Sequence, residues 1–243
     1  MKQNISFGFI FLFSLFFIQC KKQGCFTDSG NKVQKERVAG NIRNIILYDN
    51  IDLVLIQGSQ EKITVEAGKQ LEPFIETSVT NQTVTIRNNS SCDWLRSANE
   101  KVKVTLVVTD IDRISYYGAG DILSGNTLIE NEIVIDSWSG AGNIKLNIQA
   151  QMIRATIHEE NADIILSGKA EQAVIYSTSR GTIDLRSLEV QHMTITQRSV
   201  RDAYVNVLQS IDAVIMYKGN IYMKGNPIQR KVQTTNEGKL IDL

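Results

Sequence analysis

Six side chains that could contact a ligand recur along the second half of the sequence, about one every twenty residues. They are aromatic or cationic, so a wound chain would bring them onto one flank. Aromatic faces pack against sugar rings, and an arginine beside them pairs with carboxylates. A glycan- or protein-binding face is one interpretation. The other is that such columns only stabilise neighbouring strands of a sheet. The candidate binding face consists of Tyr116, Trp138, His158, Tyr176, Arg198 and Lys218.

Catalytic chemistry has less support. Polysaccharide lyases and hydrolases need clustered carboxylates, either to hold calcium or for acid–base work. Asp121, Asp163 and Asp184 are single acids in or near turns, each in a different repeat. Aspartate at a corner is more often a turn former. We therefore expect no catalytic residues and no enzyme activity, and a lyase or hydrolase is kept as an alternative.

Metals, cofactors and nucleic acids are not expected. Two histidines and three cysteines are too few for a dedicated His/Cys metal site. No glycine-rich loop precedes a helix to hold the phosphates of a cofactor. The chain has 26 basic and 26 acidic residues and no basic cluster, so nothing favours nucleic acid as a partner.

The N-terminus has the features of an export signal. Lys2 precedes an apolar run from Ile5 to Ile18, which is shorter than the roughly 20 residues of a membrane span. Cys20 follows directly, and Phe17–Cys20 resembles a loosened bacterial lipobox. We expect a signal peptide over 1–19, acylation of Cys20 and an outer membrane lipoprotein that faces the periplasm or the cell surface. An ordinary signal peptide with an incidental cysteine is the alternative.

If Cys20 is acylated, two of the three cysteines remain, Cys25 and Cys92, and an even number can pair completely. Export would place them where thiols oxidise, and closing the loop between them would constrain the unfolded chain by roughly 4 kcal/mol. Both lie in polar, loop-like segments. We expect a disulfide, with two free buried thiols as the alternative.

The elements that must position the candidate face are short strands in a repeat. Apolar residues recur with a period of about twenty, which is typical of a solenoid, and they alternate with polar residues, which indicates strands. We predict an all-β, right-handed parallel β-helix of the pectin-lyase type, with coils of about twenty residues over 113–227. Its clearest inward columns are Ile133, Ile153, Ala173, Met193, Ala213 and Ile135, Ala155, Ile175, Ile195, Ile215.

Other segments flank these coils. A lipidated tether is predicted over 20–37. No twenty-residue period holds over 38–112, which favours an irregular β half that caps the solenoid. Within that half, 71–78 has the spacing of a short helix with a proline near its start, and 79–86 is typical of a hairpin. The tail 228–243 could add a last edge strand.

The coil corners carry glycine beside Asn or Asp, as in Gly118–Ile122 and Gly140–Ile144. These residues supply left-handed or bridge backbone angles. The corners and several strand motifs, in this order, resemble the auto-transporter adhesin family with the head GIN domain, found in lipoproteins and exported proteins of Bacteroidetes. The literal Gly-Ile-Asn corner is replaced here by Gly-Asp-Ile and Gly-Asn-Ile. The motifs that carry the likeness are Asn50–Gly58, Thr83–Asn88, Lys101–Val104, the Gly-Ala-Gly corners and Tyr217–Asn220.

The resemblance covers 38–227 as one GIN-type domain. It implies a fold similar to right-handed β-helices such as pectate lyases, a role in cell adhesion and no assigned catalytic residues. We expect a non-catalytic protein, attached to the membrane by its lipid, that binds a surface glycan or an envelope protein. The alternative is a scaffolding periplasmic lipoprotein that docks through the open coil edge near Pro227.

Overall fold

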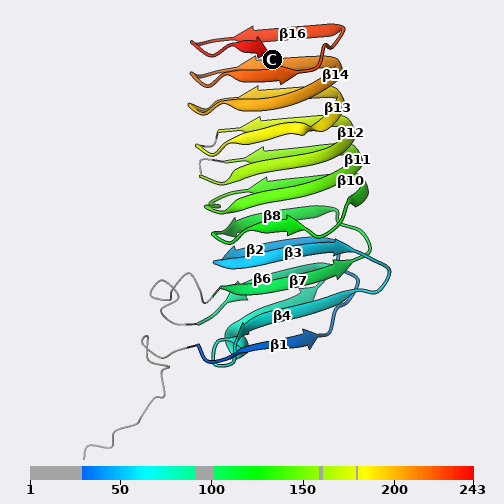
Figure 1. The fold of residues 1–243 in the computed structure, drawn as a ribbon, viewed down its shortest axis with the longest axis vertical. Coiled ribbons are helices and arrows are strands. Elements are labelled where there is room, and N and C mark those ends of the chain that lie inside the picture. The colour runs from blue at the N-terminus through cyan, green and yellow to red at the C-terminus, as the bar shows by residue number, and fades with distance from the viewer. Residues whose placement is uncertain (1–28, 91–100, 159–160, 179) are drawn as a thin grey trace, which may run out of the picture.

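The computed structural model describes residues 29–90, 101–158, 161–178 and 180–243. Its seventeen strands form one hydrogen-bonded sheet that is wound into a tall solenoid (Figure 1). The predicted signal peptide, Cys20, Cys25 and Cys92 lie outside the described residues, so their predicted roles stay predictions. Among the described residues, no helix is both long and apolar enough to cross a membrane.

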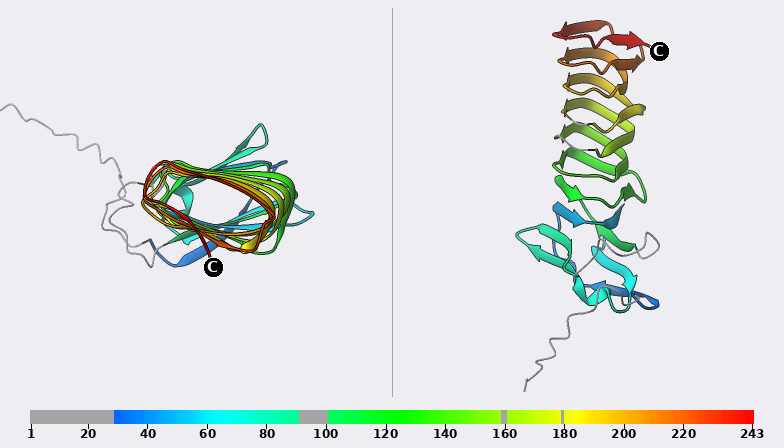
Figure 2. Two further views of the ribbon diagram at one scale, coloured as in Figure 1. Left: turned by 90° about the horizontal axis from the view of Figure 1, so that it is seen from above. Right: turned by 90° about the vertical axis from the view of Figure 1, so that its left-hand side faces the viewer.

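Each coil is a flattened loop with two faces, as the view down the axis shows (Figure 2). The first face is built from β3, β9, β15, β17 and the first halves of β11–β14. The second face is built from β2, β8, β10, β16 and the second halves of β11–β14. The coils contain β8 (Arg113–Gly118), β9 (Ile122–Ser124), β10 (Leu128–Ser137), β11 (Asn143–Ile157), β12 (Asp163–Ser177), β13 (Ile183–Gln197), β14 (Ala203–Ile215), β15 (Ile221–Lys224), β16 (Gln229–Thr234) and β17 (Leu240–Asp242).

The predicted parallel stacking of coils is confirmed. From β10 to β13 the strands pair in parallel at steps of twenty residues, except that the start of β12 pairs with β13 at a step of nineteen. Side chains of one type therefore stack above one another along most of these strands. The inward columns are almost fully removed from water, and they form one continuous core with the N-terminal half. About six turns make up the solenoid.

The step shortens between β13 and β14, where the predicted columns are wrong. Met193 pairs with Ile211, and Ile195 pairs with Ala213, two residues earlier than a period of twenty requires. Because side chains alternate in direction along a strand, an even change of register keeps the apolar set inside. Ile211, Ala213 and Ile215 are accordingly all buried.

The N-terminal half contains two further two-strand layers. β2 (Asn44–Asp49) and β3 (Ile51–Gln57) form one; β6 (Thr83–Asn88) and β7 (Val102–Val108) form the other. The β2–β3 layer lies between the β6–β7 layer and the β8–β9 layer, and all these pairings are parallel. No twenty-residue period holds here because spatial neighbours are far apart in sequence: Asn44 pairs with both Thr83 and Arg113.

Antiparallel strands close the lower end. β1 (Lys32–Arg37) pairs with β4 (Lys62–Gly68), which also pairs with β7. β5 (Ile75–Thr80) and β6 form the predicted hairpin, whose turn residues Asn81 and Gln82 both have positive φ. The helix predicted over 71–78 is wrong: the chain makes one 3-10 turn, Glu72–Phe74, and then extends into β5.

The C-terminal tail completes a coil. β16 pairs with β14, and β17 pairs with β15. The inward positions of this last layer are more polar than those beneath. Arg230 lies above Ile211 and Asp242 above Met223. Across the open end, Nη1 of Arg230 donates to both carboxylate oxygens of Asp242, at 2.8 and 2.9 Å. We call this open end the C-terminal mouth.

The left-handed backbone angles that were one part of the prediction for the corner glycines are not found. Gly118, Gly120, Gly140, Gly142 and Gly181 do not have positive φ. They allow close approach instead: a Cβ at Gly142 would collide with the carbonyl of Gly120 in the coil below, and one at Gly181 would collide with the carbonyl of Ala162. Bare backbone lets successive corners stack at strand spacing.

Candidate functional site

A column of aromatic rings runs along the corner that ends the second face. Tyr48, Tyr117, Trp138 and His158 stack on successive layers, with centroid separations of 5.1, 6.5 and 3.6 Å and interplanar angles of 18°, 8° and 13°. The guanidinium of Arg87 lies 4.2 Å from the Tyr48 centroid and covers that end. We call these five residues the aromatic ladder. Trp138, one of its two inner rings, is 48 % exposed.

Stacking decides which part of each ring faces water. The planes are nearly parallel and follow one another up the solenoid, so the faces of each inner ring are turned toward its neighbours, closely between Trp138 and His158 and more loosely between Tyr117 and Trp138. The ring edges remain exposed, and these carry the positive part of the aromatic quadrupole. The ladder therefore offers an amphipathic edge with a cation at one end, and it does not offer a row of open ring faces.

One member of the predicted face is misplaced. Tyr116 is buried: its hydroxyl donates to the Gly120 carbonyl at 2.7 Å and accepts from the Gly142 N–H at 3.0 Å. The step from β8 to β10 is twenty-one residues, so Ser137 pairs with Tyr116. An odd step exchanges inward and outward positions. Tyr117 therefore takes the outward place that the sequence assigned to its neighbour.

The remaining predicted residues divide into three groups. Trp138, His158 and Arg198 share the ladder column, because their N–H groups bond to the coil below at equivalent positions. Tyr176 is 38 % exposed and stands two residues earlier along the strand, between Thr156 and Thr196. Lys218 lies beyond β14 and pairs with Glu237 at 3.6 Å. The structure thus brings together only part of the predicted face.

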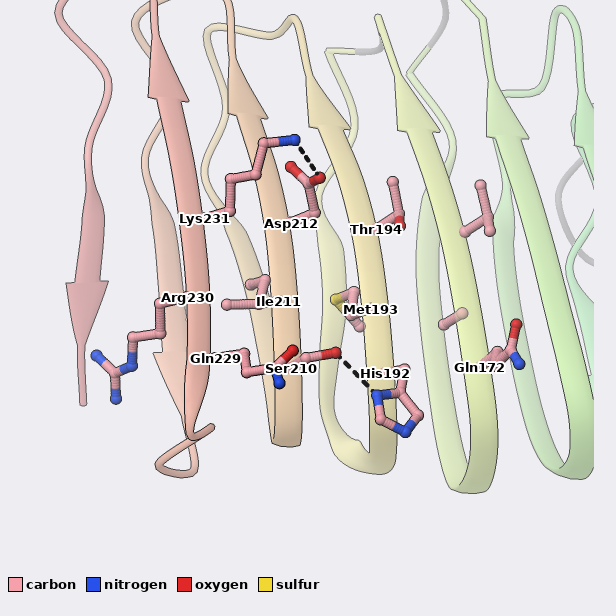
Figure 3. Close-up of a pocket in the computed structure, with 12 residues that line it drawn as sticks. Gln172, His192, Met193, Thr194, Ser210, Ile211, Asp212, Gln229, Arg230 and Lys231 are labelled. Carbon is pink, nitrogen blue, oxygen red and sulfur yellow. Dashed lines mark hydrogen bonds and ion pairs between the residues drawn. The ribbon is translucent and has the colours of Figure 1, made fainter.

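A shallow groove of about 330 Å³ lies on the second face near the C-terminal coils (Figure 3). The imidazole Nδ1 of His192 is 2.8 Å from the Ser210 hydroxyl, and its Nε2 is 3.8 Å from the Glu171 carboxylate. Asp212 accepts from the Lys231 ammonium at 2.7 Å. We call this the polar groove. Its lining residues are Gln172, Ala173, Val174, His192, Met193, Thr194, Ser210, Ile211, Asp212, Gln229, Arg230 and Lys231.

The corner aspartates link coils to each other. Asp121 accepts from the backbone N–H of Asn143 at 2.9 Å, Asp163 from that of Thr182 at 2.6 Å. Burial raises the pKa of Asp121, but the hydrogen bonds from Asn143 outweigh it and hold that pKa below its ordinary value. These carboxylates stabilise the stacking of one coil on the next. In the described part of the chain, no group of three or more His, Cys, Asp or Glu side chains could hold a metal ion.

Glu130 has the most strongly shifted carboxyl. It accepts from the Ile111 N–H at 2.9 Å and from the Gln57 amide at 3.2 Å. Burial, opposed by the backbone hydrogen bond from Ile111 and helped by the nearby charges of Asp110 and Asp112, raises the pKa of Glu130 to about 7. Glu130 therefore joins β10 to β3 and to the segment before β8 through a group that changes charge near neutral pH.

Sequence reasoning missed Tyr48, Tyr117, Arg87 and the polar groove. Tyr48 and Arg87 lie in the layers without a constant period, so no fixed spacing points to them. A step of twenty-one residues pairs Tyr117 with Trp138, and both are aromatic, so testing that step could have found Tyr117. The groove depends on the shortened step at β14, which no local motif marks.

The comparisons identify relatives of this chain. The family model described as "Putative auto-transporter adhesin, head GIN domain" matches residues 41–227. Among solved structures, a Bacteroides fragilis protein described as a "putative adhesin" has 20% identity and a TM-score of 0.79, over 88% of this chain and 97% of that one. A Parabacteroides distasonis "putative adhesin" has 18% identity and a TM-score of 0.65, over 88% and 98%.

A second Parabacteroides distasonis protein, described as a "putative lipid binding protein", has 16% identity and a TM-score of 0.63, over 88% of this chain and 97% of that one. At these identities the structures establish a shared fold and nothing about ligands. No curated protein matches the chain.

Proposed function

The chain belongs to the adhesin family with the head GIN domain, and we propose that it is a non-catalytic, lipid-anchored protein of the cell envelope that binds a partner protein through the aromatic ladder. Acylation of Cys20 would hold it at the outer membrane. The solenoid would then project the ladder away from the anchor. The observation that carries this proposal is the half-exposed Trp138 within a stacked column of rings.

A protein fits the ladder better than a glycan does. Sugar rings pack on aromatic faces, and in the ladder most of those faces are turned toward a neighbouring ring or toward Arg87. The ladder combines the half-exposed Trp138 with partly buried Tyr and with Arg, and these three residue types dominate binding at protein interfaces. Because the rings are already stacked, little side-chain entropy is lost when a partner docks.

A retention experiment tests the ladder. The full lipid-bearing chain in lipid nanodiscs is passed over immobilised envelope proteins and over a glycan array. We expect retention on protein, weakened at least tenfold by Trp138→Ala and further by adding Tyr117→Ala, because truncating a central anchor costs about 2 kcal/mol or more.

Tyr222→Ala is the matched control. It breaks a comparable stack, in which Tyr204 and Tyr222 lie 5.3 Å apart on the first face. Equal loss in this control, or retention on glycans that needs Trp138, would contradict the proposal.

Display on the cell is tested separately. Protease added to intact cells should cleave the chain if the lipid anchor leaves it on the outer surface. Replacing Cys20 by serine should release the protein from the membrane fraction, because a single signal without acyl chains does not give stable anchoring. Membrane retention of the Cys20→Ser variant would contradict the lipid anchor.

A further inference from the structure

We propose that the polar groove is a binding site for an uncharged saccharide, separate from the aromatic ladder. His192 lies six residues before Arg198, which belongs to the ladder column. At about 3.3 Å per residue, His192 lies about 20 Å from that column along the strand, and Thr194, the nearer wall of the groove, lies about 13 Å from it. The groove can therefore be tested, and can fail, independently of the ladder.

The chemistry of the walls suits hydroxyl groups. Two rows of outward side chains line the groove. The first row contains two amides, an imidazole and a hydroxyl. The second row contains a hydroxyl, a carboxylate and an ammonium. Together these groups offer both donors and acceptors of hydrogen bonds, as a polyol requires. The volume of about 330 Å³ lies at the lower end of small-molecule sites. It suits one or two sugar residues of a longer chain. The polar members of the two rows are Gln172, His192, Ser210, Gln229 and Thr194, Asp212, Lys231.

The charges of the groove argue against an acidic ligand. Lys231 is paired with Asp212 inside the groove. Arg230 points away from the other labelled side chains (Figure 3) and is held by Asp242 at the C-terminal mouth. A uronate carboxylate would therefore compete with an existing carboxylate for each of these cations. A neutral ring needs only the hydroxyl, amide and imidazole groups.

The groove lies where the register between β13 and β14 changes. The pairing of β13 with β14 shifts register between Val190 and His192, and β14 has 13 residues where β13 has 15. The coil edge is shortened beside the row that contains His192 and Ser210. Irregularities of this kind in a sheet often aim side chains at a binding site.

The test is a titration of the full chain, in nanodiscs, followed by chemical-shift changes at the groove residues. The probes are neutral disaccharides built from glucose, galactose or mannose, with galacturonate as the acidic comparison. We expect saturable shifts at His192 and Ser210 with at least one neutral sugar. Ser210→Ala and His192→Gln should weaken that binding about five- to tenfold, as loss of one hydrogen bond predicts.

Two controls complete the design. Thr156→Ala removes an outward side chain of the same sheet face outside the groove, and Trp138→Ala alters the ladder; neither should change the affinity. The proposal is overturned if no neutral sugar gives saturable shifts at the groove, if galacturonate binds more tightly than every neutral sugar, or if Thr156→Ala weakens binding as much as Ser210→Ala. Normal sugar binding by Trp138→Ala together with lost protein retention would support both sites.

Discussion

At Gly181 the absence of a side chain lets two corners touch. Its amide backbone lies against the Ala162 carbonyl of the coil below, in a space that no Cβ could enter. The same holds at Gly142 above Gly120. The repeated glycines of the corners are thus explained by contact between neighbouring coils, and each one ties the position of a corner to the corner beneath it.

This contact gives a prediction for Gly181→Ala. The added methyl must push two coils apart, and overpacking of this kind costs about 1–3 kcal/mol. Chemical denaturation of the variant should show that loss in the free energy of unfolding. Gly40→Ala is the control, because a Cβ there would meet only Val79 at an ordinary 3.7 Å. Equal stability of the two variants would show that the corners are not in close contact.

At the scale of strands and their links, Glu130 joins elements that are distant in sequence. Its carboxyl accepts from the N–H of Ile111 and from Gln57 of β3. Gln57 also bonds to the backbone of Ile129 through both its amide nitrogen and its oxygen. Three segments therefore meet at one carboxyl whose charge depends on pH.

The raised pKa of Glu130 predicts a pH effect of known sign. Its folded pKa of about 7 lies above the ordinary value of 4.5, so the folded state holds the proton more tightly. The stabilisation is fully present below pH 4.5 and is lost as pH rises through 7. Corner carboxylates such as Asp121, with a lowered pKa, act in the opposite direction at acid pH.

Unfolding measured from pH 5 to pH 9 isolates this effect when the chain is compared with Glu130→Gln. The variant keeps the hydrogen-bonding oxygen but does not titrate. Wild type should lose stability relative to the variant across neutral pH. A difference that stays constant over that range would show that Glu130 does not titrate near 7.

How far the strands could be predicted from sequence depends on the parity of each step. On the second face between β10 and β13 the step is twenty, and the inward residues were predicted correctly. The step to β14 is two residues shorter, so the apolar side was still correct and only the partners changed. The step from β8 to β10 is odd, and there the prediction exposed Tyr116 and overlooked Tyr117. Apolar periodicity fixes the face of a strand but not its partner.

At the scale of the whole molecule, the ends of the solenoid are the places where core and strand edges meet water. The lower end is closed by antiparallel strands. The C-terminal mouth, a hollow of about 490 Å³, is crossed by the ion pair of Arg230 and Asp242. Charged residues on an edge strand oppose pairing with another chain, and Arg230 and Lys231 both lie on β16.

The mouth gives a prediction for the double variant Arg230→Leu, Asp242→Leu. An apolar mouth next to unpaired strand edges should associate end to end. Sedimentation velocity should show larger species that grow with concentration, more than for wild type. Lys169→Leu with Glu189→Leu removes an exposed ion pair from the middle of the solenoid and serves as the control. Equal association of both double variants would mean that added surface apolarity alone, and not the mouth, is responsible.

The order of layers in the N-terminal half could not be predicted from sequence. The motifs of β2, β3, β6 and β7 are visible as strands, but nothing local states that β2–β3 lies between layers formed much later in the chain. Such order is set by which surfaces fit together over long separations, as in the pairing of Asn44 with Arg113. For the same reason the sequence did not predict that Tyr48 is part of the aromatic ladder, because Tyr48 lies in the β2–β3 layer.

The position of the β2–β3 layer also bears on how the molecule assembles. During synthesis this layer emerges early, yet both of its neighbours are made later. Until those neighbours are made, both edges of the β2–β3 layer lack hydrogen-bonding partners. Pairing between strands that are far apart in sequence is slow, because long loops have to close first. Each coil after β10 can then add to a finished platform, one turn at a time. We therefore expect the slow step of folding to be the assembly of the base, and the regular coils to add after it.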